Sequence, residues 1–93
     1  MSKKKLTHRG TYQLIIFNDD HHTSDEIINL LISYAGHLPT QALQCASIIR
    51  NIGKYPVIED KYDVCHDTYQ CLLEYNIVME IIKKRKYDAN SHS

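Results

Sequence analysis

The spacing of apolar residues changes several times along the chain, and each change predicts a new element of secondary structure. Residues 11–17 predict a strand, with Tyr12, Leu14 and Ile16 on one face and Gln13, Ile15 and Phe17 on the other. Thr23 and Glu26 have the spacing of a capping box, in which each side chain satisfies a backbone N–H at a helix start. The helix that they predict ends at Gly36 and turns an apolar stripe to the core: Ile27, Leu30, Leu31 and Tyr34.

A second helix and a second strand follow. Pro39 suits the first turn of a helix that ends at Gly53. The apolar stripe of this helix consists of Ala42, Cys45, Ala46 and Ile49. Residues 54–58 predict a short strand, and Pro56 belongs at a sheet edge or a strand end because it has no N–H to donate.

A third helix is predicted over residues 61–75, with Asn76 in the left-handed position after it. Its inward residues are Val64, Thr68, Cys71, Leu72 and Tyr75. Residues 77–82 are nearly all apolar, which predicts a strand in the centre of the sheet. The order β-α-α-β-α-β predicts the α+β class, a single sandwich of three helices packed on a small, mostly antiparallel sheet.

The length and the ends of the chain bound its organisation. A chain of 93 residues can build one hydrophobic core and not two. We expect a core domain over residues 11–83, a flexible basic tail over 1–10 and a polar tail over 84–93. No apolar run approaches the roughly 18 residues of a membrane span. No signal-peptide pattern opens the chain, so we expect a cytoplasmic protein that does not bind membranes.

Charge and cysteine content exclude further classes. The formal net charge is +0, although basic residues gather at 3–5 and 83–86. Because no aromatic residues alternate with the basic ones, we expect no nucleic-acid binding. The three cysteines lack CxxC spacing and are expected to be small buried hydrophobes in a reducing compartment. A zinc site at Cys65, His66 and Cys71 is the alternative, but its spacing matches no structural zinc motif, so we expect no metal or other cofactor.

The triplet at residues 18–20, Asn-Asp-Asp, joins the first strand to the first helix. Two carboxylates and an amide at this junction could bind a small cationic group through charge-assisted hydrogen bonds. Asn and Asp are also common turn residues, because their side chains bond to their own backbone. The triplet alone favours the turn.

The segment Leu14–Asp20 and the order of the elements resemble the ClpS family, small adaptors that deliver proteins with destabilising N-terminal residues to a AAA+ Clp protease. An apolar strand closed by Asn-Asp-Asp looks like the family signature. Residues 44–54 are similar to the end of the family's second helix, where a histidine stands three residues before Gly-Lys. The resemblance covers residues 12–82, and the separation of Asn18 from Gly53 fits the family pattern without a gap.

In ClpS proteins the Asn and the first Asp of the signature, together with that histidine, hold the α-amino group of the incoming peptide. The resemblance therefore implies that Asn18 and Asp19 are α-amino ligands and that Arg50 stands at the histidine position. His22 stands where the family usually has threonine, and Ser24 stands where a bulky apolar residue gates the pocket. Four further residues fall on the implied wall of the pocket for the first side chain: Ile27, Ala46, Ile49 and Met79.

Arg50 changes the chemistry expected at this site. A neutral histidine can accept a hydrogen bond from an ammonium group, whereas arginine only donates and keeps its charge. Opposite an α-ammonium at about 4 Å, it would cost on the order of 1–4 kcal/mol in a surface pocket. Pairing with Asp19 or Asp20 would relieve this cost but would occupy a carboxylate that the ligand needs. Ser24 and Ala46 leave a wider and more polar pocket.

The resemblance implies a monomeric adaptor without catalytic activity. It would bind protein substrates with a free, hydrophobic N-terminal residue (N-degrons) and dock the N-terminal domain of a Clp AAA+ ATPase. The alternative is a diverged ClpS-like interaction module, in which Arg50, His21 and His22 favour an anionic ligand.

A third class, an enzyme, depends on the polar residues around the same junction. Metal ligands or an acid–base pair could come from Asp19, Asp20, His21, His22 and Asp25. Their spacing matches no catalytic centre, and adjacent histidines before a helix are usually exposed. We therefore expect no enzymatic activity.

Overall fold

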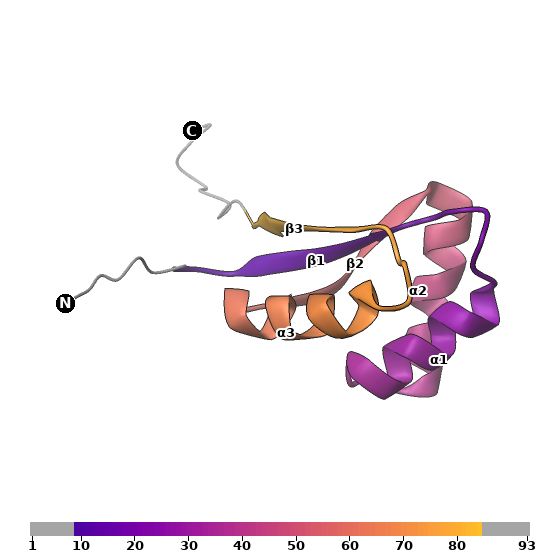
Figure 1. Ribbon diagram of the computed structural model, residues 1–93, viewed down its shortest axis with the longest axis horizontal. Coiled ribbons are helices and arrows are strands. Elements are labelled where there is room, and N and C mark those ends of the chain that lie inside the picture. The colour runs from indigo at the N-terminus through magenta and orange to yellow at the C-terminus, as the bar shows by residue number, and fades with distance from the viewer. Residues whose placement is uncertain (1–8, 85–93) are drawn as a thin grey trace, which may run out of the picture.

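The computed structural model describes residues 9–84, and its α+β fold has the predicted order of elements. The elements are β1 (Tyr12–Phe17), α1 (Ser24–Tyr34), α2 (Pro39–Ile52), β2 (Lys54–Asp60), α3 (Tyr62–Leu73) and β3 (Met79–Lys83). All three helices lie on one side of the sheet (Figure 1). Helix α3 runs along the strands, whereas α1 and α2 pack together toward the end of the sheet where β1 finishes. The predicted tails fall almost entirely outside the described residues.

The sheet has the order β2-β1-β3, and both outer strands are antiparallel to β1. The prediction that the last strand is central was therefore wrong. Strand β3 lies at an edge, and none of its five residues is fully buried: Glu80 and Lys83 are exposed and the other three are half-buried, while Ile77 is buried before the strand begins. The central strand is β1, whose residues 14–16 are all buried.

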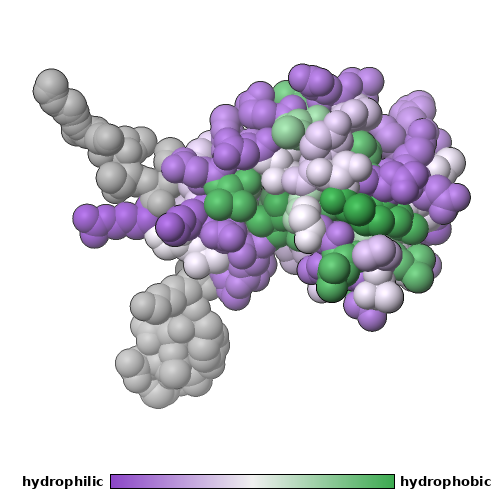
Figure 2. Space-filling model, turned by 90° about the horizontal axis from the view of Figure 1, so that it is seen from below, coloured by the Kyte–Doolittle hydropathy of each residue, from purple (hydrophilic) through white to green (hydrophobic). Residues whose placement is uncertain are grey.

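The core lies between the sheet and the helices. The four apolar residues predicted for α2 are all buried, as are Ile27 and Leu31 of α1. They meet Leu14 and Ile16 from the helix-facing side of β1. Tyr34, in contrast, remains 39% exposed at the end of α1. Figure 2 shows that hydrophobic side chains also gather on the helical side, in the half of the molecule that holds α1 and α2.

The predicted inward face of α3 is confirmed at Thr68 and Leu72 and is wrong at its other positions. The buried residues are Cys65, Thr68 and Leu72, which follow one another at intervals of three and four. The other three predicted residues are exposed: Val64, Cys71 and Tyr75. Tyr75 lies beyond the end of the helix, and Val64 and Cys71 each precede a buried position by one residue.

The cysteines are accordingly of two kinds. Burial raises the pKa of the Cys45 and Cys65 thiols, so both stay protonated and act as apolar side chains. Cys71 is exposed, contrary to the prediction. Within residues 9–84, no three His, Cys, Asp or Glu side chains are arranged to hold a metal ion. No helix in that range is long and apolar enough to cross a membrane.

The ends of the helices behave as the sequence predicts. The capping box at α1 is complete, because Glu26 N donates to Thr23 Oγ1 at 3.1 Å and Thr23 N donates to Glu26 Oε1 at 2.7 Å. Gly53 ends α2 with φ at +109°, a value that glycine adopts without strain. Asn76 has φ at 62°, the predicted left-handed conformation. These caps fix where each helix meets the loops around the candidate site.

A bulge in β2 is hydrogen-bonded to the segment between α1 and α2. Leu14 pairs with Ile58 and Ile15 pairs with Pro56, so Val57 is left without a partner across the ladder. Its carbonyl oxygen instead accepts a hydrogen bond from Nε2 of His37 at 2.7 Å. His37 is only 6% exposed, and its Nδ1 has no partner among the described residues. The bulge takes the Val57 carbonyl out of the β1–β2 ladder, and the buried His37 ring supplies the hydrogen-bond donor that this carbonyl would otherwise lack.

Replacing His37 by phenylalanine should lower the free energy of unfolding by about 1–3 kcal/mol. The variant keeps an aromatic ring but leaves the buried Val57 carbonyl without a donor. Urea denaturation measures the change, with His21→Phe as the control because His21 is exposed. Equal stability of the two variants would show that this hydrogen bond contributes nothing.

Candidate functional site

The loop between β1 and α1 meets the end of α2 at two points. Asn18 N donates to the carbonyl of Gly53 at 2.8 Å, and Nε of Arg50 donates to Oγ of Ser24 at 2.9 Å. Residues from two segments of the chain therefore form one corner, which holds Asn18, Ser24, Arg50 and Gly53. The Asn18 side chain is exposed at this corner, so its amide is accessible from solvent.

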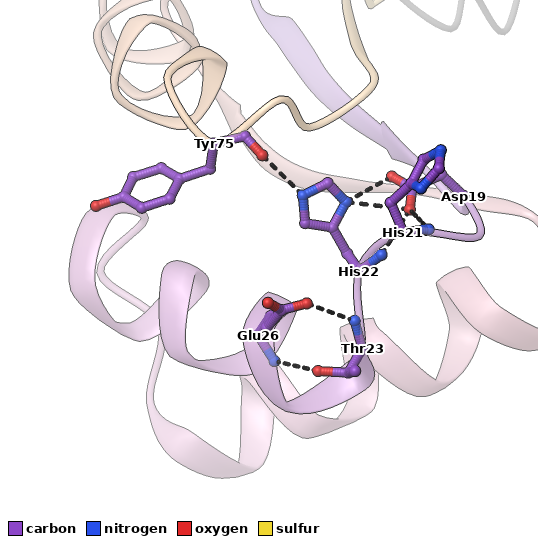
Figure 3. A network of polar contacts seen from close by, with 6 residues as sticks. All are labelled: Asp19, His21, His22, Thr23, Glu26 and Tyr75. Carbon is purple, nitrogen blue, oxygen red and sulfur yellow. Dashed lines mark hydrogen bonds and ion pairs between the residues drawn. The ribbon is translucent and has the colours of Figure 1, made fainter.

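The Asp19 carboxylate is held by groups of its own loop (Figure 3). Its Oδ1 accepts from His21 N at 2.7 Å and from His22 N at 2.8 Å, an Asx turn of the kind that the triplet favours. Nδ1 of His22 lies 2.8 Å from Oδ2 and 3.0 Å from Oδ1. On its other side, Nε2 of the same ring lies 2.7 Å from the carbonyl oxygen of Tyr75. His22 thus joins the loop before α1 to the turn after α3.

This network shifts two pKa values in opposite directions. Partial burial alone would raise the pKa of Asp19, but hydrogen bonds from the His21 backbone and from the ring and backbone of His22 outweigh it, and the pKa lies below its ordinary value. Burial alone would lower the pKa of His22. The hydrogen bond to the Tyr75 carbonyl and the interactions with Asp19, with a contribution from the charge of Glu26, raise it above its ordinary value.

Arg50 does not use the carboxylates of the triplet. Within the described part of the chain its guanidinium forms no ion pair with Asp19 or Asp20, and its partner is the hydroxyl of Ser24. The side chain is exposed, and four of its five N–H groups have no partner within residues 9–84. The corner therefore presents a cation at the position where the resemblance implies a histidine.

The apolar residues implied for the pocket wall lie close to the corner but are covered. Ile27, Ala46 and Ile49 are 8%, 3% and 3% exposed and belong to the hydrophobic core. Met79 is half-buried at the start of β3, where it pairs with Ile16 of β1. A large apolar ligand group at this corner would have to part these side chains.

An open hollow lies beside the hydrogen bonds of His22, and none of the covered apolar residues lines it. It has a volume of about 280 Å³ and is lined by His22, Glu26, Asn29, Leu30 and Tyr75. Only His22 of this set was a candidate from the sequence. The hydroxyl of Tyr75 also lies 2.8 Å from that of Tyr34 on α1. This is a second contact, besides that of His22, between the turn after α3 and the α1 segment.

The link between Asp19 and His22 was missed by the sequence analysis. The interval of three residues between an aspartate and a histidine in a turn was the available signal, because an Asx turn keeps the residues that follow the aspartate close to its carboxylate. The partner on the far side, the Tyr75 carbonyl, carries no signal at all, since every residue has a backbone carbonyl.

The pH dependence of stability follows from the two shifts. A raised histidine pKa stabilises the fold fully below the ordinary value of 6.5, and the effect is lost as the pH rises through the folded-state pKa. A lowered aspartate pKa stabilises above the ordinary value of 3.8, and this effect is lost as the pH falls through the folded-state pKa. The pair therefore contributes most between these two ordinary values.

We expect the stability lost in His22→Ala to be larger at pH 5.5 than at pH 9, by about 1 kcal/mol. Urea denaturation of both proteins at the two pH values measures this difference. His21→Ala is the matched control, because the neighbouring His21 is exposed and contributes only its backbone N–H to Asp19. A loss in His22→Ala that is the same at both pH values would contradict the ion pair.

Comparison with known proteins adds an independent line of evidence. A family model described as ATP-dependent Clp protease adaptor protein ClpS matches residues 7–77, a range that holds every candidate site residue except Met79. Among solved structures, the chain is similar to the structure of Agrobacterium tumefaciens ClpS2 bound to L-phenylalaninamide, with a TM-score of 0.66 and 12% sequence identity. The match covers 77% of this chain and 94% of the other, and it shows a shared fold. A search of curated proteins gave no match.

Proposed function

Because the chain belongs to the ClpS family of ATP-dependent Clp protease adaptor proteins, we propose that it binds protein substrates by a free N-terminus and delivers them to a Clp AAA+ ATPase. The observation that carries the proposal is the family match over residues 7–77, since this range includes β1, the corner and α2. The role of such an adaptor is to bring two proteins together, and it requires no reaction at the site.

The proposed α-amino site consists of Asn18, which belongs to the corner, and the adjacent Asp19. A protonated α-amine has three donors, and the Asn18 amide oxygen and the Asp19 carboxylate offer acceptors for them. The exposed Asn18 side chain supports this assignment. The first side chain of the substrate, hydrophobic in the proposed N-degron, would lie toward Ile27, Ala46 and Ile49 after they move apart.

The proposed partner is the N-terminal domain of the Clp ATPase, which a monomeric adaptor would dock with a surface other than the peptide site. Size-exclusion chromatography of this chain with that domain tests the partnership. Co-elution as a one-to-one complex is the expected result, and separate elution at micromolar concentrations would contradict it.

Calorimetry with phenylalaninamide and its N-acetyl derivative tests the substrate site. The two probes share the aromatic side chain and differ in the α-ammonium, so binding of the free amine alone is the expected result. Asp19→Asn should weaken that binding, because the amide has lost the negative charge. Equal affinity for both probes, or none for either, would overturn the α-amino role.

A second candidate, an anionic ligand, is favoured by the environment of Arg50. The guanidinium is exposed and makes its hydrogen bond to a neutral hydroxyl, while the nearby Asp19 is engaged with His22. A carboxylate could therefore bind Arg50 in a bidentate manner. Binding of N-acetylated acidic peptides that is abolished by Arg50→Gln would select this function over the first.

A further inference from the structure

The ring of His22 has an acceptor at each nitrogen. The Asp19 carboxylate lies 2.8 Å from Nδ1, and the Tyr75 carbonyl oxygen lies 2.7 Å from Nε2. Neither a carboxylate nor a backbone carbonyl can donate a hydrogen bond. A neutral imidazole has one N–H and would satisfy only one of these acceptors, so the geometry fits the imidazolium form, in which both nitrogens donate.

The charges around the ring agree with this form. Asp19 faces it from the preceding loop, and Glu26 acts on it from α1. The turn after α3 contributes the Tyr75 carbonyl, whereas Arg50 of α2 is bound to Ser24. The side chains of His22 and Asp19 are only 14% and 13% exposed, so solvent screens their attraction little.

We propose that the His22 imidazolium is an internal cation that occupies the Asp19 carboxylate, and that an α-ammonium ligand binds there only by displacing it. This inference rests on the proposed function for the nature of the ligand. It makes His22 a residue that sets the affinity for amines, because any incoming amine competes with a cation that is already in place. Competition is strongest at acidic pH, where the ring is fully protonated, and disappears once the ring is neutral.

The hollow beside the ring gives the displaced side chain a place to go. It has a volume of about 280 Å³ and is lined by His22 itself and by Glu26. The Glu26 carboxylate uses Oε1 for the Thr23 N–H, and its Oε2 can accept from an imidazolium that has left Asp19. Displacement thus moves the positive charge from one carboxylate to another, and the ring does not have to be buried without a partner.

The test compares the wild-type protein with His22→Thr, in which threonine supplies no cation. The affinity for phenylalaninamide is measured by calorimetry from pH 5.5 to pH 9. Because the amine of the probe titrates equally in both experiments, its own protonation cancels in the ratio of the two affinities. We expect the variant to bind about five- to tenfold more tightly at pH 5.5 and the ratio to approach one at pH 9. A ratio that does not change with pH would overturn the proposal.

Nitrogen NMR of the His22 ring provides a readout that needs no ligand and no variant. Two protonated ring nitrogens at pH 6 are expected in the wild-type protein, and a neutral ring at that pH would overturn the proposal even if peptides bind. If neither protein binds phenylalaninamide at any pH, the proposed function fails. In that case the displacement by amines is overturned with it, while the ring spectra still decide whether the internal ion pair exists. Circular dichroism confirms that His22→Thr is folded.

Discussion

Replacing Leu72 by alanine is expected to lower the free energy of unfolding by about 2–5 kcal/mol. Leu72 is 0% exposed and comes from the last turn of α3, where it belongs to the core between the helix and the sheet. Truncation removes three buried carbon atoms and leaves a cavity that the surrounding side chains fill only in part. A small domain has a total stability of about 5–15 kcal/mol, so the variant should be visibly destabilised.

The adjacent Leu73 provides the matched control. It is the same residue type at the end of the same helix, but it is 45% exposed. Leu73→Ala should change the free energy of unfolding by less than about 1 kcal/mol. Urea denaturation of both variants compares them directly, and similar losses would mean that the inward face of α3 is not the one described.

Replacing Arg50 by histidine is expected to strengthen the binding of peptides with a free N-terminal Phe by about ten- to a thousandfold. The physical reason is the removal of a permanent cation from a site proposed to receive an ammonium, an effect on the order of 1–4 kcal/mol at about 4 Å. The exposed guanidinium has no carboxylate partner among the described residues, so no internal ion pair offsets its repulsion. Calorimetry at pH 8 measures the gain, since histidine is then largely neutral.

Arg50→Lys is the control for this substitution. Lysine keeps the positive charge and should leave the affinity near that of the wild-type protein, whereas a gain in both variants would point to the loss of the Ser24 contact instead. No gain in Arg50→His, together with no binding by the wild-type protein, would count against an α-amino site at this corner.

The sequence predicts the elements well because their ends carry local signals. The capping box of α1, Gly53 and Asn76 each act within a few residues, and all three occupy the predicted positions. The position of a strand within the sheet carries no such signal. Residues 77–82 are apolar except for Glu80, and residues 14–17 are all apolar, yet only β1 is central, because both outer strands pair with it. On α3 the prediction is confirmed at Thr68 and Leu72 but not at Val64, because the neighbouring Cys65 is also apolar and the sequence does not show which of the two faces the core.

The candidate site is predictable only in its outline. The family resemblance, confirmed by the match to the ClpS family, led to Asn18, Asp19 and Arg50. It did not reveal that His22 covers Asp19, because the family usually has threonine there and the second partner of the ring is a backbone carbonyl. Nor did it reveal that Arg50 binds Ser24, since the two residues lie on different helices and 26 positions apart, and both depart from the residue type of the family.

The three-stranded sheet also has a consequence for the behaviour of the protein at high concentration. With β1 in the middle, β2 and β3 each have one backbone edge that lacks a neighbouring strand within the described residues. Unprotected edges of this kind recruit strands from other molecules and begin aggregation. In β2, Pro56 lacks an N–H, and the bulge at Val57 breaks the regular spacing of backbone hydrogen-bonding groups. The charged residues Lys54, Glu59 and Asp60 further oppose the pairing of this strand with a strand of another molecule. The same irregularity that gives His37 its carbonyl partner therefore helps to keep separate copies of the chain from joining edge to edge.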